Sequence, residues 1–177
     1  MKKSAKSAAR AAALVGVMAA TVECSKLALA SIPNVEAVTL LLAVYSYVFG
    51  SLGILASLVF VAIEPLIWGF GSWFISYLIY WPMVATVFAL MGKANCARRF
   101  LPSVVAVLLT FFFGILTSFV DVGLFTGYFE NFFSRFLIYY ARGISFYITQ
   151  IITNAILFSL LFPYITKFLF KIKRRFR

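Results

Sequence analysis

The chain has 177 residues, of which 64% are hydrophobic and 12% are charged, with a mean hydropathy of +1.02 and a formal net charge of +11. Soluble domains are only about 45–50% apolar because they need a polar surface, so this composition excludes an ordinary soluble protein. The positive charge could indicate nucleic acid as a partner, but no RNA- or DNA-binding motif accompanies it. We therefore expect a lipid bilayer around the chain and no nucleic acid.

Apolar runs along the chain predict an all-α integral membrane protein, because about 20 residues of helix cross the hydrocarbon core of a bilayer. The runs predict a bundle of six transmembrane helices that forms a single domain over residues 1–177. The expected spans are 11–31, 38–49, 54–68, 73–91, 101–124 and 143–167. The aromatic stretch 128–142 is expected either to lie along the interface or to extend the last helix.

The basic residues predict how the bundle is oriented. All of them except Lys26, Arg135 and Arg142 fall in clusters at the N-terminus, in the 92–100 loop and at the C-terminus. The clustered residues are Lys2, Lys3, Lys6, Arg10, Lys93, Arg98, Arg99, Lys167, Lys171, Lys173, Arg174, Arg175 and Arg177. Because cytoplasmic loops of membrane proteins are rich in Lys and Arg, we expect both termini and this loop to be cytoplasmic, in a bacterial plasma membrane.

Ionisable and aromatic residues near the outer helix ends predict a polar pocket that opens outward. An ionisable side chain in hydrocarbon costs about 2.5–3.5 kcal/mol, so Glu64 needs a partner or water. Glu23 and Lys26 are three residues apart and are expected to pair on one helix face. Aromatic residues expected at the same level are Trp68, Phe70, Trp73, Tyr77, Tyr139, Tyr140 and Tyr147. These residues also have structural interpretations. The ionisable side chains could form interhelical polar contacts or reach the lipid headgroups, and the aromatic residues could form an interfacial belt.

Small residues recur every three or four positions along the first helix, at Ala5, Ala9, Ala12 or Ala13, Gly16 and Ala20. In membranes this spacing lets two helices approach closely. It predicts either packing inside this protein or a docking face for a partner membrane protein.

Motifs for catalysis and for metal or nucleotide binding are missing from the sequence. Gly92-Lys93 lacks the flanking glycine and the Ser or Thr of a phosphate-binding loop. Two cysteines and no histidine support no metal site, and no nucleophile–base pair is visible. We expect neither an enzyme nor a covalently bound cofactor.

Three segments carry a resemblance to a known family. They are the Ala-rich first helix around residues 9–13, the segment Ile32-Pro33-Asn34-Val35-Glu36 followed by Val38-Thr39-Leu40-Leu41, and Gly69-Phe70-Gly71 leading into Trp73, Tyr77 and Trp81. With the size and the six expected spans, they make the chain similar to the substrate-binding S-components of energy-coupling-factor (ECF) vitamin transporters. In that family the S-component captures a vitamin outside and docks through its first helix onto a transmembrane scaffold that carries two cytoplasmic ATPases.

The resemblance implies a site and partners for this chain. The implied docking surface is Ala9, Ala12, Ala13 and Gly16, and ATP would be hydrolysed by the partner subunits. The expected substrate-binding residues are Asn34, Glu36, Glu64, Trp68, Phe70, Trp73, Tyr77, Asp121, Arg135, Tyr139, Arg142 and Tyr147. A wide aromatic surface with few charges favours cobalamin or a related corrinoid as the vitamin, with pantothenate, pyridoxine and queuosine precursors as the other candidates.

Two functions of other classes remain open. One is a stand-alone proton- or ion-coupled transporter of small solutes, with Glu64 or Asp121 as the coupling group. The other is a structural or assembly protein of the membrane. If the ligand does not bind near Glu64, the sequence favours a site between Asp121, Arg135 and Arg142 instead.

Overall fold

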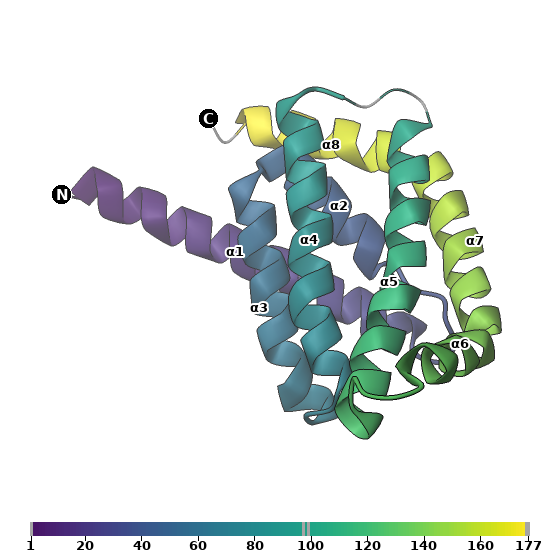
Figure 1. Cartoon of the computed structure of the whole chain (residues 1–177). Coiled ribbons are helices and arrows are strands. Elements are labelled where there is room, and N and C mark those ends of the chain that lie inside the picture. Colours follow the sequence, from purple (N-terminus) through teal and green to yellow (C-terminus); the bar gives the residue numbers. More distant parts are fainter. Residues whose placement is uncertain (1, 97, 99, 176–177) are drawn as a thin grey trace.

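The computed structural model describes residues 2–96, 98 and 100–175, and in this part of the chain all regular secondary structure is helical. The helices are α1 (Lys2–Leu29), α2 (Val38–Phe49), α3 (Ser51–Trp68), α4 (Trp73–Lys93), α5 (Leu101–Thr126), α6 (Phe132–Arg142), α7 (Ile144–Leu160) and α8 (Phe162–Arg175). Figure 1 shows α3, α4 and α5 running side by side, with α6 at one end of the bundle and α8 at the other.

Several of these helices have the length and composition of membrane spans. Within the described residues, four helical segments are long and apolar enough to cross a membrane: Ser7–Leu29, Ser51–Trp68, Trp73–Lys93 and Leu101–Thr126. The pair α6 and α7, bent by 58°, becomes a fifth if it is counted as one span. The shorter α2 is also apolar. The all-α fold is therefore confirmed, with several apolar helices that suggest a multi-pass membrane protein.

The C-terminal region differs in detail from the expected spans. The run 143–167, expected as one helix, is divided at Leu161 into α7 and α8. Pro163 is the second residue of α8, where its missing N–H costs nothing, and proline disfavours helical geometry in the residue before it. The aromatic stretch before Gly143 forms α6, a separate helix that is set at an angle to α7.

The short helix α2 lies at the centre of the core. It packs against α1, α3, α4, α7 and α8, and Leu42, Ala43 and Val44 along it are fully buried. A helix covered by protein on most sides has no need to match the thickness of the hydrocarbon layer. Its 12 residues are therefore enough to fill the centre of the bundle.

Basic segments gather at one end of the bundle. Figure 1 shows α8 at the same end of the bundle as the last turn of α4 and the first turn of α5. Lys173 of α8 donates a hydrogen bond to the carbonyl oxygen of Val48 and lies 5.7 Å from the ring centroid of Phe49. These contacts hold α8 against the C-terminal end of α2. The connection between α3 and α4 lies at the opposite end (Figure 1).

Candidate functional site

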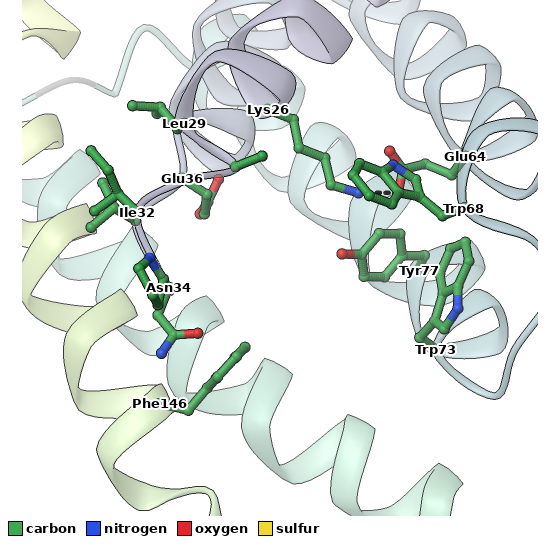
Figure 2. A pocket seen from close by; sticks show the side chains of 13 residues that line it. Lys26, Leu29, Ile32, Asn34, Glu36, Glu64, Trp68, Trp73, Tyr77 and Phe146 are labelled. Carbon is green, nitrogen blue, oxygen red and sulfur yellow. Dashed lines mark hydrogen bonds and ion pairs between the residues drawn. The ribbon is translucent and has the colours of Figure 1, made fainter.

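A pocket of about 360 Å³ opens between the C-terminal ends of α1 and α3, the connection from α1 to α2, and the first turns of α4 and α7. Its walls are formed by Lys26, Leu29, Ala30, Ile32, Pro33, Asn34, Val35, Glu36, Glu64, Trp68, Trp73, Tyr77 and Phe146. Figure 2 shows Lys26, Glu64, Trp68 and Tyr77 gathered on one side, with Asn34 and Glu36 on the other. Six of the residues expected from the sequence therefore line one cavity: Asn34, Glu36, Glu64, Trp68, Trp73 and Tyr77.

An ion pair between two helices forms the charged side of the pocket. The Nζ atom of Lys26 on α1 pairs with Oε2 of Glu64 on α3 (Figure 2). The Glu64 side chain is 1% exposed and that of Lys26 is 23% exposed. The expected pairing of Lys26 with Glu23 is wrong. Because α1 packs against α3, the Lys26 ammonium group forms its ion pair with the buried Glu64 instead.

Glu23 adds a second carboxyl group beside this ion pair. It is 7% exposed, and its carboxyl group lies within hydrogen-bonding range of that of Glu64. Among the described residues, no hydrogen-bond donor reaches either oxygen of Glu23 or Oε1 of Glu64. The cluster therefore holds two buried carboxyl groups against one ammonium group.

Aromatic rings form the wall around this cluster. Trp73 and Tyr77 share a face of α4 because they are four residues apart, and their ring centroids are 5.1 Å apart. Trp68 is at the end of α3, where Gly69 adopts a φ of +76° and donates its N–H to the carbonyl oxygen of Pro65. This left-handed geometry favours glycine and turns the chain from α3 into α4, so that Trp68 and Trp73 border the same cavity.

The opposite wall is held by hydrogen bonds of Glu36. Its Oε2 accepts from the Thr39 backbone N–H (2.9 Å), and its Oε1 accepts from the Thr39 hydroxyl (2.6 Å) and from Nδ2 of Asn154 (3.1 Å). Asn154 also donates to the hydroxyl of Thr110 (3.0 Å). Glu36 thus caps the start of α2 and ties the pocket-lining loop to α5 and α7.

The remaining expected residues lie outside the pocket. Tyr139 donates to Asp121 (2.8 Å) between α6 and α5, and the Tyr147 hydroxyl bonds to Ser118 (3.1 Å). Arg135 donates to the backbone carbonyls of Thr126, Gly127 and Glu130, and so holds the α5–α6 connection in place. Phe70 is 80% exposed, and Arg142 is exposed at the end of α6.

The small residues of α1 lie on its exposed face. Ala9, Ala12, Ala13 and Gly16 are all exposed, and a Cβ atom added to Gly16 would meet nothing within 4 Å. The buried face of the same helix is formed by Val15, Met18, Ala19 and Val22. The small-residue stripe is thus left uncovered by the part of the chain that the structure describes.

Sequence reasoning missed two kinds of lining residue. Lys26 stood out as a cation in an apolar span, but its partner is 38 positions away on another helix. Phe146 and the apolar residues of the 29–35 segment carry no local signal, because only the packing of α7 and this loop brings them to the pocket.

No protein-family model matches the chain, and no match was found among curated proteins or among solved structures. The geometry of the pocket and of the α1 surface therefore carries the functional argument.

Proposed function

We propose that this chain is the membrane-embedded substrate-binding subunit of an ATP-driven importer of the ECF type, and that it binds a small vitamin-like nutrient. The observation that carries the proposal is the pocket around Lys26, Glu64 and Trp73. Lys26 and Glu64 are charged side chains whose placement in hydrocarbon costs free energy, and they line one cavity together with aromatic rings. Small-molecule sites combine an apolar and aromatic lining with a few placed polar groups in the same way.

The proposed topology has six crossings, formed by α1 to α5 and α7, with both termini in the cytoplasm of a bacterium. The excess of Lys and Arg in α8 and in the 94–100 connection assigns that end of the bundle to the cytoplasm. The pocket is lined by Trp68 and Trp73 on either side of the α3–α4 connection, and Figure 1 shows this connection at the opposite end. It would therefore receive its ligand from outside the cell.

The size of the pocket bears on the choice of vitamin. A volume of about 360 Å³ lies near the lower end of the range of roughly 300–1,000 Å³ for small-molecule sites. Pyridoxine, pantothenate or a queuosine precursor suits this volume best. A corrinoid is far larger and would fit only if the loop 30–36 moved away from α4.

The exposed small residues of α1 support a docking role. Ala9, Ala13 and Gly16 leave the helix backbone open to close approach by another helix, and side chains of this chain do not cover them. We propose that a transmembrane scaffold with two cytoplasmic ATPases binds here. ATP hydrolysis would then take place in these partners.

Reconstituted uptake tests this proposal. The purified chain alone in proteoliposomes should import none of pyridoxine, pantothenate and cobalamin. Co-reconstitution with a scaffold and its ATPases, co-expressed from a bacterium, should give ATP-dependent uptake of one of them. Uptake by the chain alone would contradict the proposal.

The pair of Glu23 and Glu64 favours a second candidate, a proton-coupled transporter that works alone. Buried carboxyl groups of transmembrane helices carry the coupled proton in many proton-driven transporters, and Glu23 and Glu64 are both buried beside Lys26. In this case an imposed proton gradient, without ATP or partners, would drive uptake by the parent chain. Glu23→Gln would abolish that uptake.

A further inference from the structure

We infer that the ligand of this pocket carries a positively charged nitrogen group, and that the ammonium group of Lys26 lies where the ligand's charge would bind. The inference rests on the proposed ligand-binding function and narrows it to a class of substrate. Three observations carry it: the charge balance of the pocket, its buried acceptors without donors, and the aromatic rings around Lys26.

The pocket has an excess of negative charge in a strongly basic protein. Lys26 is the only cation among the described lining residues, which include Glu36 and Glu64, and the buried Glu23, which does not line the pocket, lies next to Glu64. The chain as a whole has a net charge of +11. A cleft lined by one sign of charge between apolar walls attracts ligands of the opposite sign.

Buried oxygens at the pocket have no hydrogen-bond donor. Oε1 of Glu64 and both oxygens of Glu23 accept no bond from the described residues, although Glu64 is fully buried and Glu23 is more than nine-tenths buried. A buried acceptor without a donor is costly, and more so when it is charged. An ammonium group offers three N–H donors and no acceptor, so it forms charge-assisted hydrogen bonds with a carboxylate that are stronger than those from a neutral donor.

The rings around the Lys26 ammonium group form a cation-binding cage. Its Nζ atom lies 5.3 Å from the ring centroid of Trp68, 5.3 Å from that of Tyr77 and 5.9 Å from that of Phe60. Cations bind aromatic faces within about 6 Å, and aromatic cages recognise organic ammonium ligands in this way. Figure 2 shows two of these rings, Trp68 and Tyr77, beside Lys26. The flexible stem of a lysine allows Lys26 to leave it when a ligand arrives.

A ligand with a negative charge would be bound differently. It would need the Lys26 ammonium group, which Glu64 already neutralises, and it would lie against Glu36 and Glu64. Replacement of Lys26 therefore separates the two cases by the sign of its effect. A cationic ligand gains the cage when Lys26 is removed, whereas an anionic ligand loses its only partner.

The test uses the full chain in lipid nanodiscs and isothermal titration calorimetry at pH 7. The probes share one ring and differ in charge at one substituent: pyridoxamine is an ammonium, pyridoxine an alcohol and 4-pyridoxate a carboxylate. Thiamine, a cation, and pantothenate, an anion, extend the series. We expect pyridoxamine to bind at least about tenfold more tightly than pyridoxine, since a charge-assisted hydrogen bond exceeds 1.4 kcal/mol.

Three variants complete the test. Glu64→Gln should weaken pyridoxamine binding about tenfold and leave pyridoxine binding unchanged, by the same reasoning. Lys26→Met should strengthen pyridoxamine binding. Glu130→Gln removes an exposed carboxyl group outside the pocket and should change neither. The thermal unfolding midpoint of each variant shows that it is folded, and Lys26→Met decides the question if Glu64→Gln does not fold.

Each outcome has a clear reading. Preferential binding of pyridoxamine or thiamine, strengthened by Lys26→Met, supports the inference. Equal or preferential binding of pyridoxine, 4-pyridoxate or pantothenate overturns the inference. Loss of cation binding in Lys26→Met overturns it as well. Neither result contradicts the proposed function. If none of the five probes binds, the inference fails, and the proposed function fails with it if cobalamin and a queuosine precursor do not bind either.

Discussion

Two helical glycines should respond in opposite ways to a larger side chain. A Cβ atom on Gly53 of α3 would clash with Cα of Ser46 and lie 2.5 Å from its backbone nitrogen, in the neighbouring helix α2. A Cβ atom on Gly16 of α1 would meet nothing within 4 Å. Gly53 therefore permits close packing inside the bundle, whereas Gly16 faces away from it.

The magnitudes follow from this geometry. Replacing a helical glycine by alanine stabilises by about 0.5–1 kcal/mol where there is space, so Gly16→Ala should raise the free energy of unfolding by that amount. Overpacking costs about 1–3 kcal/mol, and Ser46 meets Gly53 with its backbone, which cannot rotate away. Gly53→Ala should therefore lose a net ~1–2 kcal/mol, after the helix gain is subtracted. For a chain of this size, 1 kcal/mol shifts the unfolding midpoint by about 2–4 °C.

Gly16→Leu separates the effect of the α1 face on transport from an effect on stability. Its side chain has space in this chain, so the unfolding midpoint in detergent and ligand binding should both stay close to those of the parent. ATP-dependent uptake with partners should fall strongly, because a bulky residue prevents close helix approach. Gly53→Ala should instead lower the unfolding midpoint. If Gly16→Leu destabilises the chain as much as Gly53→Ala does, the α1 face is part of this protein's own packing. If uptake is unchanged, the face is not a docking surface.

Three further perturbations test the pocket and its supports. Trp73→Ala should weaken ligand binding by about 1–3 kcal/mol as measured by calorimetry. Phe70→Ala alters an exposed ring outside the pocket and should leave binding unchanged. Equal effects of the two variants would contradict the boundary of the pocket. Asn154→Leu should lower the unfolding midpoint, because it loses one bond to Thr110 of α5 and one to Glu36 in the α1–α2 connection, each worth about 0.6–1.7 kcal/mol. Thr149→Val on the same helix is the control, because Thr149 bonds to its own helix. Arg135→Met should speed proteolysis of the α5–α6 connection, because three carbonyls lose their donor; an unchanged cleavage rate would refute this role.

Features that depend on spacing within one helix could be predicted from the sequence. The pairs Glu64–Trp68 and Trp73–Tyr77 are each four residues apart, so their placement at one level of adjacent helices follows from the helical repeat. Glycine after Trp68 indicated the turn that brings the two helices together. These four residues line the pocket in the structure.

Features that depend on packing between distant segments could not be predicted. The ion pair between Lys26 and Glu64 and the bond from Asn154 to Glu36 join residues 38 and 118 positions apart, and no local pattern indicates them. Phe70 follows Gly69 in the α3–α4 connection, and it does not line the pocket although Trp68 and Trp73 on either side of it do. The same limit applies to Asp121, Arg135 and Tyr139, whose polar groups support the α5–α6 region.

Native mass spectrometry tests most directly whether this pocket binds a small molecule. The chain would be incubated with the five probes, cobalamin and a bacterial metabolite extract, and compared with the double variant Trp68→Ala, Trp73→Ala. We predict one bound small molecule per parent chain and none in the double variant, provided that its unfolding midpoint is close to that of the parent. Equal occupancy of both proteins, or no bound molecule in the parent, would contradict the proposed site.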